Sequence, residues 1–507
     1  MGVHDFTIYD MIRRNARTHA DNVSVVFNDR RLTHIQFKHH CDRLAGGLAN
    51  AGVGKGDRIA VVAQNSDEYL ILYGAASKLG AIVLPVNWRF QSNEVKYVLE
   101  DGAPKVLFAG PEYQASAVEA AGGIDTIQGF YSIGGHGTSD RFQPFEALYS
   151  ENDADRDFDV STESGYAIIH TAAVEGRPRG ALVSQGGVTA GNLMIMQRYG
   201  IGPGDAHVCL IPLFHIAGFG LAMAVMHAGG KNVIMDRFDA KTALKLIETE
   251  KSTIFFDFAP ILKSLMDAND EEKRDISSIR MVVGLDQAEN ILRFQKWAPG
   301  ASFWSLFAQA EALCVTTAPY NEKPGSAGIP YPTARVALFD DYDREAPTGA
   351  PGEICVRSAN VFRGYWGLDE QTRHTFRNNW HHTGDIGRFD EDGYLWYVKR
   401  KAEKELIKTG GENVYPSEVE KAILTHDSVR ETCVIGVPDK DWGEAVKAVC
   451  VLEPGAQLKP EELIEYVASK IARYKKPRYV VFTDRLPKKA DGEIDRERVK
   501  KDHGGQC

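Results

Sequence analysis

The sequence predicts an α/β protein with a large N-terminal domain of α/β layers, a β-rich subdomain and a small α+β C-terminal domain. The 507 residues exceed the ~100–200 residues of a typical domain, so more than one core is expected. Helical and strand patterns alternate through the first half, which is typical of crossover units and parallel sheets. After Lys323 the pattern changes to shorter strands separated by glycine and proline turns.

Hydrophobic periodicity gives the order of the elements expected in the first half. A helix over residues 37–51 ends in the turn-forming sequence Gly-Val-Gly-Lys-Gly-Asp. The elements that follow alternate between strand and helix, beginning with a strand, over residues 58–63, 68–79, 81–85, 92–99 and 105–109. A polar stretch over residues 134–163 then separates this run from a second α/β run that ends at Pro299.

A charged segment over residues 399–405 marks the expected boundary between the two domains. Before it, strands with frequent glycine and proline indicate the β-rich subdomain. After it comes a compact α/β unit. We therefore predict an N-terminal domain of residues 1–404 and a C-terminal domain of residues 405–507. We interpret the charged segment as an exposed hinge, and a solvated helix face is the alternative.

Composition excludes several classes of protein. Hydrophobic residues make up 43% and charged residues 25% of the chain, as in ordinary globular proteins. The net charge of −10 argues against a nucleic-acid binder or a membrane-surface binder, because both need basic patches. No apolar run approaches the ~20 residues of a membrane span, and the start lacks signal-peptide features. The seven cysteines lack disulfide, redox or zinc spacing, so we expect a cytoplasmic protein without structural zinc.

The segment at residues 171–180 resembles a phosphate-binding loop in its position and length but lacks most of the residue types that contact phosphate. In such loops glycines let backbone N–H groups approach phosphate oxygens, while hydroxyl groups and a lysine add contacts. Here Ala172, Ala173 and Val174 stand where glycine and hydroxyl groups would be useful. Glu175 would bring a carboxylate toward anionic phosphate. Taken alone, the segment predicts only a turn.

Six further segments appear in a fixed order and change this interpretation. They read IPLFHIAG, FAQAE, GYW, TGD, GGENVYP and LPKKADGE, at residues 211–218, 307–311, 364–366, 383–385, 410–416 and 486–493. Together they resemble the acyl- and aryl-CoA synthetases of the adenylate-forming (ANL) superfamily, over about residues 9–498. The resemblance implies the ANL fold and a two-step reaction. A carboxylic acid and ATP first give acyl-AMP and pyrophosphate; the C-terminal domain then rotates and the CoA thiol displaces AMP.

The resemblance implies a set of nucleotide-binding residues. Asp385 would accept hydrogen bonds from both ribose hydroxyls, a geometry that suits a carboxylate. Arg400 would face the ribose and phosphate, although Ala402 takes this place if an apparent two-residue insertion is ignored. Phe307 would stack on adenine. The residues that resemble the adenine-pocket backbone are Gly284, Leu285 and Asp286. Glu311 resembles a magnesium-binding glutamate, although the metal is dispensable if ATP is not used.

The resemblance also implies residues for thiol transfer. His215 would lie beside the acyl carboxyl group; a purely structural histidine is the alternative. The loop over residues 409–416 would line the tunnel for the pantetheine arm of CoA, where glycines allow close approach. The residues expected at this transfer site are Lys408, Gly410, Gly411 and Glu412. The hinge position is Glu405 or its neighbour Lys404. The candidates for contacts with CoA phosphates are Lys401, Lys404, Lys475 and Lys476, and the alternative is that they are solvated surface lysines.

The departures from the family pattern concentrate in the adenylation half-reaction. The lysine of the phosphate loop is Arg179, and Ala310 replaces a phosphate-contacting threonine. Most importantly, Glu493 stands where the family has the lysine that bridges the substrate carboxylate and the α-phosphate. Losing one preorganised donor costs roughly 2.7–4 kcal/mol of transition-state stabilisation, and a carboxylate also repels both reactants. The degenerate positions are Ala172, Ala173, Val174, Glu175, Ala310 and Glu493. We therefore expect adenylation to be disabled.

The leading hypothesis is an acyl-CoA ligase that catalyses thiolation only. It would convert preformed acyl-AMP and CoA to acyl-CoA and AMP, with acyl-AMP supplied by a separate adenylating enzyme. The pattern resembles the non-adenylating CoA ligases of platensimycin-type diterpenoid pathways, which implies a bulky hydrophobic acid. One alternative is a complete ATP-dependent ligase in which Lys488 or Lys489 replaces the missing lysine. Another is a non-catalytic protein that binds acyl nucleotide or CoA.

Three features of the substrate and assembly stay open at this point. The stretches at residues 214–221 and 255–260 suggest an apolar acyl pocket but do not identify the acid. The thiol acceptor is free CoA or the pantetheine arm of a carrier protein. Dimers are common among relatives, so a homodimer is an expectation from the resemblance alone.

Overall fold

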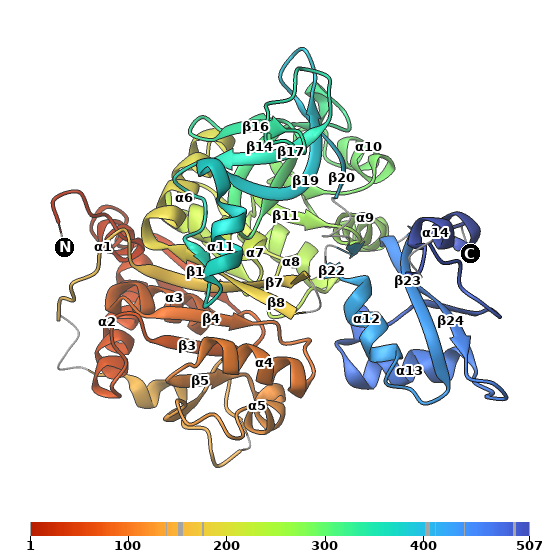
Figure 1. Cartoon of the computed structure of the whole chain (residues 1–507). Coiled ribbons are helices and arrows are strands. Elements are labelled where there is room, and N and C mark those ends of the chain that lie inside the picture. Colours follow the sequence, from red (N-terminus) through yellow and green to blue (C-terminus); the bar gives the residue numbers. More distant parts are fainter. Residues whose placement is uncertain are drawn as a thin grey trace.

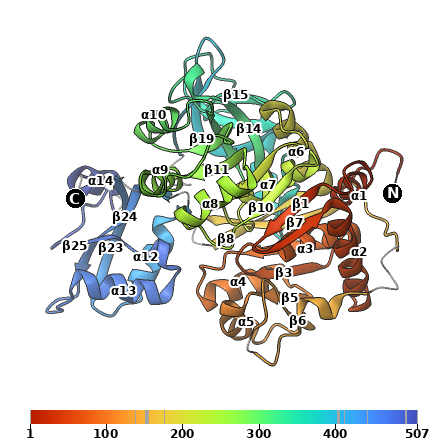
Figure 2. The ribbon, with the colours of Figure 1, turned by 180° about the vertical axis from the view of Figure 1, so that it is seen from behind.

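The computed structural model describes residues 2–137, 139–150, 156–174, 177–400, 406–410, 412–440, 442–489 and 493–505. Several sequence predictions lie outside these residues or concern side chains that are not described: Ala172, Ala173, Val174, Glu175, Lys401, Ala402, Lys404, Glu405 and Gly411. Figures 1 and 2 show a large body and a smaller C-terminal lobe beside it. Within the described residues, no helix is both long and apolar enough to cross a membrane.

The first α/β layer is built on a sheet of seven described strands in the order β18-β8-β7-β4-β3-β5-β6. Its strands are β3 (Arg58–Val62), β4 (Ile82–Val86), β5 (Val106–Ala109), β6 (Gly129–Ser132), β7 (Gly165–Val174), β8 (Arg177–Ser184) and β18 (Gly364–Tyr365). The helices of this layer are α1 (Ile8–Thr18), α2 (His34–Asn50), α3 (Asp67–Leu79), α4 (Ser92–Gly102) and α5 (Gln114–Ala120). Strand β3 pairs in parallel with both β4 and β5. The predicted alternation of strands and helices is confirmed here.

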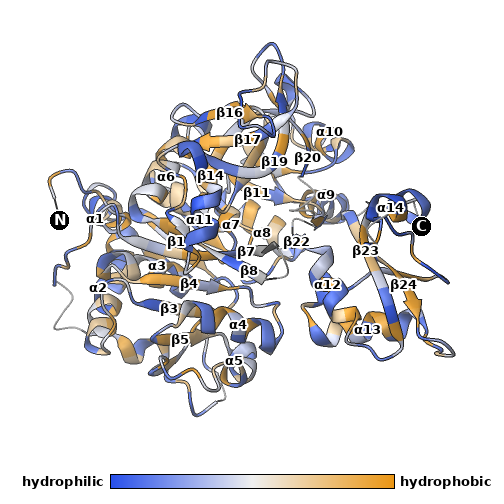
Figure 3. Cartoon of the chain, viewed as in Figure 1, coloured by the Kyte–Doolittle hydropathy of each residue, from blue (hydrophilic) through white to orange (hydrophobic). Residues whose placement is uncertain are grey.

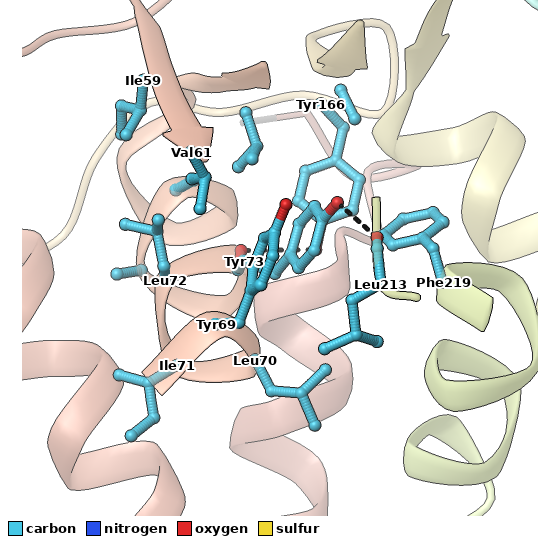
Figure 4. Packing of buried hydrophobic residues seen from close by; sticks show 14 of the residues in the cluster. Ile59, Val61, Tyr69, Leu70, Ile71, Leu72, Tyr73, Tyr166, Leu213 and Phe219 are labelled. Atoms are coloured by element: carbon cyan, nitrogen blue, oxygen red, sulfur yellow. Dashed lines mark hydrogen bonds between the residues drawn. The ribbon is translucent and has the colours of Figure 1, made fainter. Parts of the chain in front are cut away.

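Helix α3 shows how the local sequence defines an element. The Ser66 hydroxyl accepts a hydrogen bond from the Tyr69 N–H and caps the first turn. Gly80 ends the helix in a left-handed conformation with φ of 75°. Between these ends, Tyr73 donates a hydrogen bond to the Leu213 carbonyl at 3.1 Å, which ties the helix to the segment before α7 (Figure 4).

The second layer is built on a sheet of nine described strands in the order β15-β14-β13-β12-β11-β9-β10-β1-β2. Its strands are β1 (Val23–Phe27), β2 (Arg30–Thr33), β9 (Ala206–Cys209), β10 (Lys231–Ile234), β11 (Ile254–Phe258), β12 (Met281–Leu285), β13 (Ser302–Gln309), β14 (Ala312–Pro319) and β15 (Ile329–Pro330). Its helices are α6 (Gln185–Tyr199), α7 (Ile216–His227), α8 (Ala240–Glu250), α9 (Ile261–Glu272) and α10 (Ala288–Trp297). Every residue of α7 is buried, and its side chains enter the cores of both layers.

The β-rich subdomain and the C-terminal domain follow the two large sheets. Four antiparallel strands form the subdomain in the order β16-β17-β19-β20. This confirms the β-rich subdomain predicted after Lys323. These elements are β16 (Arg335–Phe339), β17 (Gly352–Arg357), β19 (His381–Phe389), β20 (Leu395–Arg400) and helix α11 (Asp369–Thr375). The C-terminal domain contains β21 (Ile407–Thr409), β22 (Glu412–Val414), β23 (Val429–Asp439), β24 (Gly443–Leu452), β25 (Tyr479–Phe482), α12 (Pro416–Ile423), α13 (Pro460–Lys470) and α14 (Arg496–His503). Figure 3 shows that α11 and α14 are largely hydrophilic.

The degenerate phosphate segment differs from the turn predicted for it. Strands β7 and β8 are antiparallel and extend through most of residues 171–180, with Thr171 opposite Arg179 and Val174 opposite Arg177. The segment is therefore largely a β-hairpin. Its backbone groups pair across the two strands, so they are less free to approach a ligand than the N–H groups of an open glycine loop.

Candidate active site

A cavity of about 940 Å³ lies between the large domain and the C-terminal domain. Residues from β7, β8, β13, β20 and the start of α7 line one side, and residues from β21 to β24 line the other. Most of the motifs singled out in the sequence meet here, although they come from segments far apart in the chain. Three groups of residues lie at the ends of the cavity predicted from the sequence to hold the ribose, the acyl group and the thiol.

At the end predicted to hold the ribose, Arg400 lines the cavity, and Asp385 of β19 lies beside it with a side chain that is 1% exposed and is not among the described lining residues. Arg400 lies opposite it in the β19–β20 register and donates from Nε at 2.9 Å. The Tyr397 hydroxyl donates to the same carboxylate at 3.3 Å, and the Gln309 amide donates to its other oxygen. Arg400 lines the cavity, whereas Ala402, the alternative, lies outside the described residues. Attraction to Asp385 raises the pKa of Arg400 despite the opposing effect of burial.

A buried polar network supports Asp385 from behind. Glu353 accepts hydrogen bonds from the Gly384 N–H at 2.9 Å and from Arg377 at 3.0 Å. The His382 Nδ1 atom lies 3.0 Å from Glu353 Oε2 and 3.2 Å from Cys355 Sγ. Ligand atoms of these last three residues lie within 4.8 Å of one another, as metal ligands can. Because both Glu353 oxygens already accept from protein donors, the arrangement serves to hold residues 383–385 in place.

Only some of the residues predicted to form the adenine pocket line the cavity. Leu285 and Asp286 line the cavity at the end of β12. At Gly284 an added Cβ would lie 2.1 Å from the Asp257 carbonyl oxygen, so the close strand packing requires glycine. Phe307, by contrast, belongs to a buried cluster of the β-rich subdomain and is not among the described lining residues. Tyr397 lines the cavity instead, with its ring 6.4 Å from that of Phe307.

Asp286 forms a carboxyl pair with Asp257, which sequence reasoning did not predict. Asp257 is fully buried on β11, and its Oδ1 accepts a hydrogen bond from the Leu262 N–H at 3.0 Å. The Oδ2 atoms of both side chains are buried and meet no donor among the described residues. Burial, followed by the nearby Asp286 charge, holds the pKa of Asp257 well above its usual value. The protonated form of Asp257 is therefore favoured beyond the pH at which an exposed aspartate ionises.

His215 occupies the acyl end and is the N-cap residue of α7. Its Nδ1 accepts a hydrogen bond from the Ala217 N–H at 3.1 Å, and its ring makes an edge contact with Phe258. Burial lowers the pKa of His215, so the neutral imidazole is favoured. An Nδ1 that accepts leaves the proton on Nε2, so this atom is a hydrogen-bond donor.

The predicted thiolation loop enters the cavity from the C-terminal domain. Lys408, Glu412 and Tyr415 line the cavity, and the Glu412 carboxylate pairs with Arg89 of the large domain at 2.7 Å. The Lys408 ammonium lies 4.9 Å from the centre of the Tyr397 ring, and desolvation lowers its pKa. Gly410 has φ of 56°, and an added Cβ there would meet Trp442 and the Ala259 carbonyl oxygen at 3.3 Å.

The described positions that depart from the family pattern, Ala310, Arg179 and Glu493, fall in two places. Ala310 and Arg179 line the cavity, where Arg179 lies 5.5 Å from the centre of the Tyr365 ring. The neighbouring Glu311 accepts a hydrogen bond from the Tyr365 hydroxyl at 2.9 Å. Glu493 is instead exposed, lies 3.9 Å from the Lys489 ammonium and is not among the described lining residues.

Two lysines expected at CoA phosphates have carboxylate partners. Lys475 is 3% exposed, and its ammonium lies 2.6 Å from both Glu94 and Glu418. Lys476 pairs with Glu465 at 2.7 Å. Lys475 lines the cavity, but two carboxylates already neutralise its charge in this arrangement, and its contact with a CoA phosphate stays a prediction. Sequence spacing gave no signal for this pairing, since Glu94 and Lys475 are 381 positions apart.

The fold and the residues of the cavity are those of an AMP-binding enzyme. The AMP-binding enzyme model matches residues 12–366, and the AMP-binding enzyme C-terminal domain model matches residues 418–493. The chain therefore belongs to the AMP-binding enzyme family and has the adenylating-enzyme fold, with a large and a small domain.

Three comparisons with known proteins agree with this assignment. The chain is 31% identical to a feruloyl-CoA synthase from an Amycolatopsis species over 498 residues, which covers 97% of this chain and 98% of the relative. A solved structure from Rhodopseudomonas palustris, provisionally named a long-chain-fatty-acid CoA ligase, is 41% identical with a TM-score of 0.74 and covers 79% of this chain and 100% of its own. An amide bond synthetase from Marinactinospora thermotolerans is 26% identical with a TM-score of 0.88, covering 98% and 100% of the two chains.

Proposed function

We propose that this enzyme is an acid–CoA ligase that catalyses only the second half-reaction, from acyl-AMP and CoA to acyl-CoA and AMP. The observation that carries the proposal is Glu493, which stands at the position of the adenylation lysine. Lys488 and Lys489, the two candidate replacements, lie 3.1 Å from Glu431 and 3.9 Å from Glu493. Each is therefore next to a carboxylate. A separate adenylating enzyme would supply the acyl-AMP.

The residues of the cavity suit the transfer step. Asp385, with Arg400 beside it, would hold the ribose, and the loop that carries Glu412 would guide the pantetheine arm. Attack of the CoA sulfur on the acyl carbon forms the C–S bond and breaks the bond to the AMP oxygen. AMP leaves with that electron pair, and the thiol proton is released to solvent. The Nε2–H of His215 would donate to the acyl oxygen as its negative charge develops.

The acid is proposed to be bulky and hydrophobic, of the diterpenoid type. The apolar residues Phe214, Ile216, Phe258 and Leu285 line one part of the cavity, and its volume of about 940 Å³ must hold AMP as well. Relatives act on aromatic acids by name, and feruloyl-CoA synthase is one of them. The substrate panel should therefore contain aryl, fatty and diterpenoid acids.

Magnesium is proposed to be dispensable for this half-reaction. Glu311 supplies one carboxylate, and Mg²⁺ is commonly held by one or two carboxylates together with substrate phosphates. The residue thus fits a magnesium ion that also contacts a triphosphate. Thiolation does not use triphosphate, so the metal has no charge to neutralise at the β- and γ-positions.

A two-part assay tests the proposal. The acid panel is first supplied with ATP, Mg²⁺ and CoA, and pyrophosphate is measured. Synthetic acyl-AMP esters of the same acids are then supplied with CoA, and thioester is measured. We expect thioester in the second reaction without matching pyrophosphate release in the first.

The second candidate is a complete ATP-dependent acid–CoA ligase. It is favoured by the position of Arg179, which lines the cavity and could replace the loop lysine as a phosphate contact. Pyrophosphate release at the rate of thioester formation would favour this candidate. A protein that forms neither product but binds acyl-AMP would be the non-catalytic binder.

A further inference from the structure

A buried ion-pair cluster joins the C-terminal domain to the large domain at one wall of the cavity. Its centre is Lys475, whose ammonium lies 2.6 Å from Glu94 Oε1 and 2.6 Å from Glu418 Oε1. Glu94 belongs to α4 of the large domain, whereas Glu418 belongs to α12 of the C-terminal domain. The lysine is therefore shared between the two domains.

The aromatic rings that contact the Lys475 ammonium also come from both domains. The Lys475 ammonium lies 4.7 Å from the centre of the Phe90 ring and 5.7 Å from that of Tyr474. Phe90 precedes α4 in the large domain, and Tyr474 adjoins Lys475 in the C-terminal domain. Each domain thus gives the ammonium one carboxylate and one aromatic face.

The large-domain side of the cluster is preorganised. The second oxygen of Glu94 accepts a hydrogen bond from the Gln91 N–H at 2.9 Å, within a capping box at the start of α4. Two more contacts with the C-terminal domain come from the same segment. Arg89 pairs with Glu412 at 2.7 Å, and the Asn93 side chain donates to the Lys470 carbonyl at 3.2 Å.

We propose that Lys475 is a positioning residue that clamps the C-terminal domain against α4 and makes the transfer arrangement the resting state of the enzyme. Burying an ammonium is unfavourable unless it is paired, and here half of its partners belong to the other domain. Rotation of the C-terminal domain would separate Lys475 from Glu94 and Phe90. This inference rests on the proposed function, because an enzyme that only transfers the acyl group has no need to leave this arrangement.

The test measures the distance between the two domains in the ligand-free full-length enzyme. Spin labels are placed at two exposed positions, Thr249→Cys on α8 and Glu461→Cys on α13, with Cys507→Ser as background. Pulsed electron–electron double resonance then gives the distribution of distances. We expect a single distance for the otherwise unchanged enzyme. In Glu94→Gln a second, rotated population should rise at least tenfold, whereas Glu94→Asp, which keeps the charge, should give less of it.

The matched control is Glu112→Gln, which removes an exposed ion pair with Arg237 inside the large domain. It should leave the distance distribution unchanged. If Glu94→Gln does not fold, Lys475→Met tests the same clamp from the other side, because methionine keeps the volume and loses the charge. A Glu94→Gln or Lys475→Met distribution identical to that of the parent enzyme would overturn the clamp. Absence of thioester from acyl-AMP in the parent enzyme would instead refute the proposed function and leave the distance result standing.

Discussion

The raised pKa of Asp257 makes the pH dependence of stability a direct test of the site. The pKa of Asp257 is raised in the folded enzyme, so the folded state binds this proton more tightly than the unfolded state does. The free energy of unfolding therefore falls as pH rises from the usual value of 3.8 toward the folded pKa. The slope that one such group contributes is about 1.4 kcal/mol per pH unit.

The perturbation that isolates this effect is Asp257→Asn. The asparagine Oδ1 can still accept from the Leu262 N–H, and its Nδ2 can donate to Asp286 without a titrating proton. We expect the variant to become more stable relative to the parent enzyme as pH rises, and to match it near pH 4. Asp257→Leu should show the same dependence on pH, offset by a cost of about 1–3 kcal/mol for each partner left unpaired.

The measurement is the thermal unfolding midpoint from pH 4 to pH 9, expressed as the difference between variant and parent. This difference cancels the contributions of the titrating groups that do not interact with Asp257; the titration of Asp286, which does, changes with the substitution. Asp140→Asn, at an exposed position, is the matched control and should give a difference near zero throughout. A difference for Asp257→Asn that stays constant with pH would refute the raised pKa, since it would mean that Asp257 is already ionised in the folded enzyme.

Three further predictions concern activity. Asp385→Asn should lower kcat/KM for thioester formation from acyl-AMP by about 10–100-fold, because a charged acceptor is lost and Arg400 is left unpaired; an unchanged value would exclude Asp385 as the ribose ligand. His215→Phe should lower kcat by about 10²–10³ with little change in KM, as expected for a donor that acts in the transition state, and a change confined to KM would contradict that role. Glu493→Lys alone should restore little ATP-dependent pyrophosphate release, because the phosphate segment around Glu175 is altered as well; full recovery would show that Glu493 is the single defect.

Local patterns in the sequence predicted much of the fold. The alternation of helix and strand gave the parallel core around β3, β4 and β5, and the change after Lys323 gave the antiparallel subdomain. Hydrophobic periodicity is decided by neighbouring residues, so a single sequence can reveal it. The hairpin at Thr171 and Arg179 was missed because cross-strand pairing, and not local composition, extends the strands there.

The sequence predicted only those residues of the candidate site that belong to a recognisable motif. Asp385 and Arg400 meet as expected, because both belong to neighbouring strands of a recognisable pattern. The Asp257 carboxyl pair, the network behind Asp385 and the clamp at Lys475 were not predictable. Each of these three clusters joins residues from segments with no shared motif. The burial of their charged and polar side chains decides how they pair and how their pKa values shift. The sequence does not display burial at single polar positions, so Lys475 looked like one more surface lysine.

The proposed clamp at Lys475 and the proposed loss of the adenylation lysine at Glu493 both concern which domain arrangements the enzyme needs during its cycle. An enzyme that both adenylates and transfers must visit two domain arrangements in each cycle, so neither can be much lower in free energy than the other. Every 1.4 kcal/mol of preference reduces the population of the disfavoured arrangement tenfold, and the rate of the step that needs it falls in proportion. A buried lysine shared between the domains, such as Lys475, would slow a complete ligase. In an enzyme with Glu493 at the adenylation position the same preference has no cost, because no step needs the other arrangement.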